Sequence, residues 1–420
     1  MQDRSRKTIV RWYLIAATMA VFPSFVFPGD RVKTGIEVLR DRGFDVLKGK
    51  RVGLITNPTG VTSSLEATVD VLARAPGVTL VALFGPEHGV RGDREAGKYV
   101  ESSIDEATRL PVYSLYGKTR KPTPEMLKGV DVLVYDIQDI GVRSYTYIST
   151  MGFAMEAAAE NGIEFVVLDR PNPLTGVRVE GTMLDENFKS FVGMYPIPYV
   201  YGMTAGELAT MINEERWLNG GKRCKLQVVP MAGWKRSLWW DETGLPWVPP
   251  SPHIPNSTTP MFYVMTGLLG ELGTVNQGVG YTLPFELVGA PWLDGRIFAR
   301  YLNSQGMPGV QFRPMVYRPF YFDTTGQPYG GVHIHVTDRD RVELSVVQFA
   351  ILEALFRLFP ERDIFQRART DKVQMFDKVN GSDRVRMLLQ TKGNVDDILR
   401  VIDRERAQFM IKREKYLIYY

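Results

Sequence analysis

The 420-residue chain has a single cysteine, Cys224, and no low-complexity tract. One cysteine excludes an intrachain disulfide framework and a cysteine-rich metal site. The 51 basic and 47 acidic residues are spread along the sequence, leave a net charge of +4 and form no block long enough to follow a nucleic-acid backbone. We therefore expect no nucleic-acid partner. The hydrophobic content of 44% predicts a folded globular protein of two or three domains.

Long apolar runs are also missing, except at the N-terminus. Four basic residues lie within the first eleven positions, and an uncharged run over 12–27 follows them. This order is typical of an export signal, and the run is shorter than the roughly 20 residues that a spanning helix needs. We predict a signal peptide or signal anchor over 1–30, a secreted or periplasmic location, and no stable membrane span in the mature protein.

From residue 51 onward, short apolar runs alternate with helical patterns. The runs are nearly continuous in valine, isoleucine and leucine, which is typical of parallel strands covered on both faces by helices. The sequence therefore predicts an α/β fold, a Rossmann-like doubly wound domain over 31–255. The expected strands are 51–56, 78–84, 111–116, 131–137, 163–169 and 225–231, with helices near 65–75, after Pro124, up to Asn161 and from Thr204.

A segment rich in proline and tryptophan, 233–260, predicts the boundary between this domain and a second one. Its four tryptophans suit either a core or a surface that stacks on sugar rings. The second unit, 256–420, is expected to be a smaller α+β domain. It contains an apolar strand pattern at 331–338 and a helical pattern at 345–358, followed by a basic C-terminal helix.

Polar side chains follow four of the predicted strands at the point where each strand ends. Ligands of an open α/β sheet bind beyond the carboxyl ends of its strands, so these loops predict a site at that edge. Turn formation is the alternative for the first and last loops, because Asn, Pro and Gly make turns without any function. The candidate residues are Asn57, Glu87, His88, Asp136, Gln138, Asp139, Asp169, Arg170 and Asn172.

The order and spacing of several motifs resemble the exo-β-N-acetylmuramidase (NamZ-like) family of glycoside hydrolases. The motifs include GLITNPTGV, LVALFGPEHGVRG, VLVYDIQDIGVRSYTYISTM, FVVLDRPNPLTG, YPIPYVYGMTAGELA and PFELVGAPW, and the resemblance covers about 35–420. It implies an exo-acting hydrolase that uses no cofactor and releases terminal N-acetylmuramic acid from peptidoglycan fragments or muropeptides. It also implies an active site in the cleft between the two domains.

Three positions depart from the pattern of that family. Tyr201 stands where the family has a histidine, His253 where it has an asparagine, and Val279 where it has an arginine. The carboxylate loops are unchanged, so the resemblance implies that hydrolysis is retained, on N-acetylmuramic acid or a related amino sugar. The matching positions expected to bind the sugar include Tyr145, Tyr201, His253 and Glu271.

Cleavage of a glycosidic bond needs a proton donor and a second carboxylate, which acts as base, nucleophile or acetamido orienter. We expect Glu87 to be the general acid, with His88 either orienting it or capping the loop. Asp136 and Asp139 compete for the second role, and the sequence favours neither.

The lactyl carboxylate of muramic acid predicts an arginine in the pocket, because a guanidinium matches a carboxylate with two hydrogen bonds. Arg143 is the first candidate and Arg91 the second. Asp169 and Arg170 either contact the substrate or form a structural ion pair.

Two other classes of function compete with this interpretation. In a metal-dependent hydrolase, Glu87, His88, Asp136 and Asp139 would ligate the ion, and His333 with His335 forms a further pair. The two histidines are spaced by two residues, so both rings lie on the same face of the predicted strand. We expect a structural role for them and no metal site, because metal centres need several convergent ligands. The other class is a non-catalytic module that binds cell-wall glycan.

Overall fold

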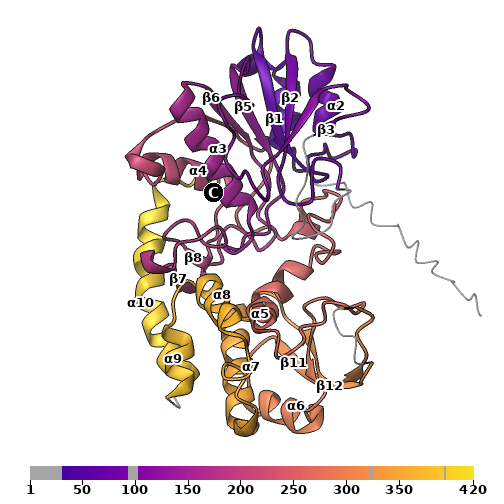
Figure 1. Ribbon diagram of the computed structural model, residues 1–420, viewed down its shortest axis with the longest axis vertical. Coiled ribbons are helices and arrows are strands. Elements are labelled where there is room, and N and C mark those ends of the chain that lie inside the picture. Colours follow the sequence, from indigo (N-terminus) through magenta and orange to yellow (C-terminus); the bar gives the residue numbers. More distant parts are fainter. Residues whose placement is uncertain (1–30, 93–102, 322–325, 392–393) are drawn as a thin grey trace, which may run out of the picture.

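The computed structural model describes residues 31–92, 103–321, 326–391 and 394–420. Figure 1 shows a sheet-centred part at one end of the molecule and a helix-rich part at the other. The predicted export signal over 1–30 lies outside the described residues. Within the described ranges, no helix combines the length and the apolar character needed to cross a membrane.

A seven-stranded sheet forms the centre of the first part. Within the described residues, six of its strands run parallel, and β3 runs antiparallel to β4 at one edge. The chain passes outward from β1 to β2 and then returns to place β5 on the other side of β1, which is the predicted doubly wound order. In spatial order the strands are β3 (Ser103–Ile104), β4 (Pro111–Ser114), β2 (Thr79–Gly85), β1 (Arg51–Thr56), β5 (Val132–Asp136), β6 (Glu164–Leu168) and β9 (Lys225–Val229).

Helices cover both faces of this sheet because successive strand residues point to opposite sides. Val132 and Val134 of β5 pack in the same apolar layer as α1 and α2. Leu133 and Tyr135 pack in the other layer, with α3 and α4. This explains the continuous apolar runs in the sequence. The four helices are α1 (Gly35–Asp41), α2 (Thr68–Ala73), α3 (Tyr147–Asn161) and α4 (Ala205–Glu214).

The second part is built on a three-stranded antiparallel sheet with helices packed against it. Helix α5 packs on both α7 and α8, and a two-stranded ribbon of β7 and β8 packs on α10 between the two parts. The strands are β10 (Leu287–Ala290), β12 (Tyr329–Val336), β11 (Val310–Tyr317), β7 (Glu180–Met183) and β8 (Pro198–Val200). The helices are α5 (Thr259–Leu272), α6 (Gly295–Ser304), α7 (Leu344–Leu358), α8 (Thr370–Asn380), α9 (Arg384–Gln390) and α10 (Val395–Glu414).

The two parts share their apolar cores. Val142 and Tyr199, from the first part of the chain, pack in the core of the second. In the opposite direction, α10 returns the C-terminus to the first part, where Phe409 packs in the core and the Tyr419 hydroxyl donates a 2.6 Å hydrogen bond to the Asp169 carboxylate. The domain boundary predicted at 255/256 stays a prediction. Residues before it pack in the core of the second part, and residues after it pack in the core of the first.

Two local expectations change once the chain is folded. The segment after Pro124 forms turns and not a helix, and Gly129, with a φ of 82°, lies at its end. The tryptophans of 233–260 belong to the protein interior: Trp234, Trp239 and Trp240 are at most 6% exposed, and Trp247 packs edge-on against Trp240 with ring centroids 4.9 Å apart. Of the two alternatives for these indoles, the structure supports the core.

Helix α3 packs closely against Tyr195 because residue 152 has no side chain. A Cβ atom at Gly152 would lie 1.7 Å from the Tyr195 hydroxyl oxygen. We expect Gly152→Ala to lower the free energy of unfolding by about 1–3 kcal/mol, measured by urea denaturation. Tyr195→Phe removes the clashing oxygen, which has no hydrogen-bond partner among the described residues, so the double variant should regain part of the loss. An equal loss in both backgrounds would contradict a steric cause.

Candidate active site

The loops that follow β1, β5 and β6 come together at the carboxyl edge of the sheet, as predicted, but they form a closed network. The Gln138 backbone N–H donates to the Thr59 hydroxyl, 2.8 Å away. The Gln138 side chain donates to the carbonyl of Pro171 at 2.7 Å. Asn57 accepts from the Thr59 N–H at 3.0 Å. Both amide side chains are buried, that of Asn57 holding its own loop and that of Gln138 joining two loops.

Asp136 belongs to this network and not to an open cleft. Its carboxylate is fully buried and pairs with both nitrogens of one edge of the Arg170 guanidinium, at 2.5 and 3.0 Å. Thr68 donates a further hydrogen bond to it. Because both oxygens are occupied, Asp136 has no face left for a substrate. Arg170 completes its own contacts with the carbonyl of Val61, at 2.8 Å.

Asp139 and Asp169 are also held inside the protein. The Tyr201 hydroxyl and the Gly141 N–H both donate to the same oxygen of Asp139, while the other oxygen has no hydrogen-bond partner among the described residues. Asp169 accepts from Thr204 at 2.7 Å, next to the start of α4. Burial raises the pKa of Asp139 to about 6 and that of Asp169 to about 6. Asn172, in the loop after β6, donates to the carbonyl of Met203, in the segment before α4.

Neither predicted arginine reaches a substrate cavity. Arg143 is fully buried, and its guanidinium donates to four backbone carbonyls: those of Thr182, Ile197, Val379 and Asn380. Burial lowers the pKa of Arg143 to about 10. Arg91 pairs with Asp105 at 3.0 and 3.1 Å and lies within 3.7 Å of Asp70. These positions correct the expectation that either arginine binds the lactyl group.

A cleft lies instead between the two parts, beside the loop after β2. Its first cavity, of about 310 Å³, is lined by Glu87 and His88 from that loop and by Tyr145 from the loop before α3. His253, from the segment that connects the two parts, and Glu271, from α5 of the second part, also line it. Five of the fifteen predicted site residues therefore meet here, although the sequence separates them by up to 184 positions from Glu87 to Glu271.

The Glu87 side chain is half-buried and held by hydroxyl groups. Thr146 donates to its carboxylate at 3.2 Å. Burial, the negative charge of Glu87 and a hydrogen bond to it together raise the pKa of Tyr116 to about 12. His88, the next residue, has a φ of 74°, a value uncommon for a residue with a side chain. This turn places His88 in the cavity wall beside Glu87.

Glu271 faces the same cavity from the last turns of α5. It is half-buried, and burial raises its pKa above the ordinary value for a glutamate. Tyr263, two turns earlier on the helix, lines the same cavity as both carboxylates. Burial is the main cause that raises the pKa of its hydroxyl, and Tyr199, Glu271 and Glu87 raise it further. Ser144 holds that hydroxyl at 3.1 Å.

The cleft continues into a second cavity of about 440 Å³ in the second part. Tyr263, Glu271, His253 and Phe285 line both cavities, so the two cavities adjoin. The His253 ring lies 3.2 Å from the Tyr321 hydroxyl, and burial and the nearby His88 lower its pKa. Val279, the position where the resemblance implies an arginine, also lines the second cavity.

Sequence reasoning missed several residues that line this site, among them Tyr263 and Lys372. A signal for Tyr263 exists, because Tyr263, Gly267 and Glu271 are spaced by four and share one helix face. Lys372 has no such signal, since a lysine on an amphipathic helix is ordinarily a surface residue.

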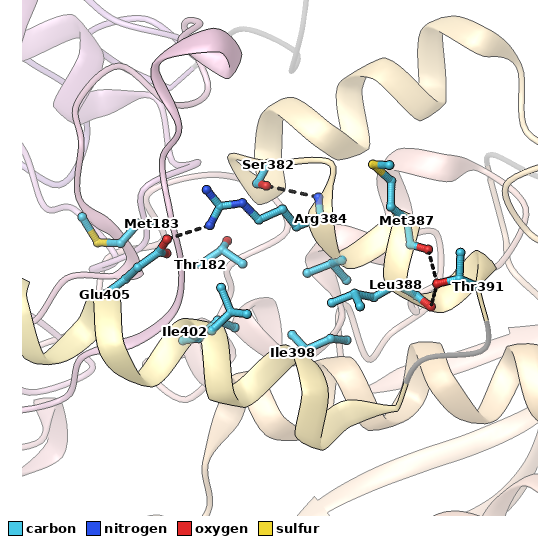
Figure 2. A pocket seen from close by; sticks show the side chains of 12 residues that line it. Thr182, Met183, Ser382, Arg384, Met387, Leu388, Thr391, Ile398, Ile402 and Glu405 are labelled. Atoms are coloured by element: carbon cyan, nitrogen blue, oxygen red, sulfur yellow. Dashed lines mark hydrogen bonds and ion pairs between the residues drawn. The ribbon is translucent and has the colours of Figure 1, made fainter.

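A separate apolar cavity of about 340 Å³ lies between β7, α9 and α10. Figure 2 shows Leu388, Ile398 and Ile402 pointing into it and Arg384 crossing its upper side toward Glu405. Among the described residues that line it, Glu405 is the only acidic one, and it pairs with Arg384 at 2.7 Å. This cavity therefore lacks the two carboxylates that hydrolysis of a glycosidic bond needs.

The histidine pair of β12 stands apart from the cleft. The His333 and His335 rings lie on one face of the strand with centroids 4.0 Å apart, and Glu286 lies 3.4 Å from His333. In the part of the chain that the structure describes, no group of three or more ligand side chains is placed to hold a metal ion.

Two carboxylates that face one cavity between a Rossmann-like domain and a smaller domain are the pair of groups with which a glycoside hydrolase works. The family models for exo-beta-N-acetylmuramidase NamZ match it over both parts, the N-terminal model at residues 52–258 and the C-terminal model at 261–419. The chain belongs to this family, which confirms the resemblance seen in its motifs.

Individual relatives agree with this assignment. The chain is 47% identical over 389 residues to the peptidoglycan beta-N-acetylmuramidase NamZ of Bacillus subtilis, covering 93% of this chain and 92% of the relative. A crystal structure of a DUF1343 family protein from Bacteroides fragilis matches with a TM-score of 0.89 and 50% identity, over 93% and 99% of the two chains. A second DUF1343 protein of that organism matches with a TM-score of 0.75 and 32% identity, over 92% and 99%.

The raised pKa of Asp139 predicts a pH-dependent loss of stability. Between about pH 4 and 6 the folded protein keeps a proton on Asp139 that the unfolded chain has released, so the free energy of unfolding falls as the pH rises through this range. Asp139→Asn keeps an acceptor for Tyr201 and Gly141 but carries no charge.

The test measures the free energy of unfolding of Asp139→Asn and of the unsubstituted protein by urea denaturation at pH 4 and at pH 7. We expect the difference, variant minus unsubstituted protein, to be about 2–3 kcal/mol larger at pH 7 than at pH 4. Asp169 titrates in both proteins, so its contribution cancels. A difference that does not change with pH would show that the carboxyl of Asp139 titrates normally.

Proposed function

We propose that this chain hydrolyses the glycosidic bond of a terminal N-acetylmuramic acid residue in peptidoglycan fragments. The observation that carries the proposal is the pair Glu87 and Glu271, one from each domain, lining the same cavity. Its volume is within the range of pockets that bind small molecules. The Bacillus subtilis relative, a peptidoglycan beta-N-acetylmuramidase, supports the choice of sugar.

Glu87 acts as the general acid that protonates the leaving oxygen. Thr146 and Tyr116 fix the orientation of its carboxyl group, and an oriented acid contributes a factor of about 10²–10⁴ to the rate. His88 lies beside it in the cavity wall and orients it further.

Glu271 takes the second carboxylate role, which the sequence alone assigned to Asp136 or Asp139. Those two side chains are enclosed by Arg170, Thr68, Tyr201 and Gly141. Burial raises the pKa of Glu271 toward neutral pH, where a general base accepts a proton most effectively. Glu271 accordingly accepts a proton from the attacking water or orients the acetamido group of the sugar.

Aromatic rings supply the walls of the sugar site. Tyr145 and Tyr147 pack edge to face with centroids 4.9 Å apart, and Tyr263 packs on Phe285 at the same centroid distance. Such rings offer apolar faces to the C–H groups of a sugar and hydroxyls at their edges. The charged N-terminus and the apolar run that follows support export of the chain to the compartment that contains peptidoglycan. Cell fractionation with and without residues 1–30 tests the location.

We expect Glu87→Gln to lower kcat/KM on a natural muramyl disaccharide by a factor of about 10² or more, because the leaving oxygen must then depart unprotonated. The loss should be much smaller on a 4-nitrophenyl glycoside, whose leaving group needs little protonation. Glu106→Gln, at an exposed position, is the matched control. Full activity of Glu87→Gln on the disaccharide would exclude Glu87 as the acid.

For Glu271→Gln we expect a loss of about 10² or more that is similar on both substrates, because a base or acetamido orienter acts whatever the leaving group. Steady-state kinetics on the disaccharide and on the 4-nitrophenyl glycoside measure both losses. If the loss for Glu271→Gln depends on the leaving group and the loss for Glu87→Gln does not, the two roles are exchanged.

A further inference from the structure

The site contains a cation that the catalytic roles leave unused. Lys372, in the first turn of α8, lines the second cavity together with Glu271, His253 and Tyr329. Lys372 is the only lysine or arginine among the described residues that line either cavity of the cleft. A substrate carboxylate in this cleft would therefore meet one positively charged side chain.

The ammonium group of Lys372 is not held in an ion pair by the described part of the chain. Among the described residues no carboxylate forms an ion pair with it, and its acidic neighbour Asp371 is held by Arg369 at 2.6 and 2.9 Å. Lys372 is half-buried, so its aliphatic stem packs while the charged end stays accessible from the cavity. Glu271 senses this charge, which partly offsets the effect of burial on the pKa of Glu271.

The fold fixes where this charge lies. Helix α8 packs along α5, which carries Glu271, and the last carbonyls of α8 are held by Arg143 at 3.2 and 2.7 Å. Glu87 lines the first cavity and Lys372 the second, with Glu271 lining both. A sugar with its glycosidic oxygen near Glu87 that extends past Glu271 into the second cavity would bring its other substituents to Lys372.

We propose that Lys372 is the specificity-determining residue that binds the lactyl carboxylate of N-acetylmuramic acid. This inference rests on the proposed function, because it takes muramic acid as the sugar. It gives to Lys372 the role that the sequence assigned to Arg143. An ammonium is a compact charge with three N–H donors, so it can donate hydrogen bonds to the carboxylate without the fixed geometry of a guanidinium.

The test compares three 4-nitrophenyl glycosides. They are the β-N-acetylmuraminide, the same compound with its lactyl carboxylate converted to an uncharged methylamide, and the N-acetyl-β-glucosaminide. We expect Lys372→Met to lower kcat/KM on the muraminide about tenfold or more, chiefly through KM, because the contact lies away from the bond that is cleaved. The losses on the methylamide and the glucosaminide should be much smaller.

Two further variants separate charge from structure. Lys372→Arg should restore most of the muraminide activity, because it keeps the positive charge. Lys378→Met, at an exposed position on the same helix, should behave like the unsubstituted protein. Equal losses on all three glycosides with Lys372→Met, or no rescue by arginine, would overturn the proposal and assign Lys372 to the positioning of Glu271.

The failure of the proposed function has a different signature. In that case the unsubstituted protein would not hydrolyse the muraminide. Binding of free N-acetylmuramic acid and of free N-acetylglucosamine, measured by titration calorimetry, then tests Lys372 without turnover. Weaker binding of the acid alone in Lys372→Met supports the proposal, and the absence of any preference for the acid in the unsubstituted protein contradicts it.

Discussion

The geometry of the cleft depends on one buried arginine. Arg143 directly precedes the cleft residues Ser144 and Tyr145, and its guanidinium holds four carbonyls, two of them at the end of α8. A fully buried guanidinium is costly unless its donors are paired, and here the backbone supplies the acceptors. The arrangement fixes the loop that lines one wall of the cleft to the helix that lines another.

A second set of buried charges keeps the sheet edge rigid. Asp136 and Arg170 form an ion pair between the loops after β5 and β6, and the Gln138 side chain also joins these two loops. The Gln138 backbone N–H links them to the loop after β1 through the Thr59 hydroxyl. Such a network occupies the place where an open α/β sheet commonly binds its ligand. The cleft lies instead beside the loop after β2, and residues of the second domain complete its lining.

This division explains why the two candidate catalytic glutamates differ in surroundings. Glu87 is held on a rigid loop by hydroxyl groups of the first domain, whereas Glu271 projects from a helix of the second domain and is exposed to the charge of Lys372. The two domains are joined through shared cores and through the returning C-terminal helix. The spacing of the two carboxylates is therefore set by domain packing.

The sequence by itself determined the alternation of strands and helices, the doubly wound class and the loops in which polar residues gather, because these follow from local hydrophobic pattern and turn chemistry. The strand-end pattern also predicted Glu87, and the family resemblance Glu271, as site residues, and both line the same cavity. Only the tertiary structure decided that Asp136, Asp139 and Arg143 are enclosed and that Lys372 faces the cavity. Burial and ion pairing depend on contacts between residues far apart in the chain, such as Asp136 with Arg170 or Arg143 with Asn380, and no local pattern records which charge meets a partner and which meets solvent.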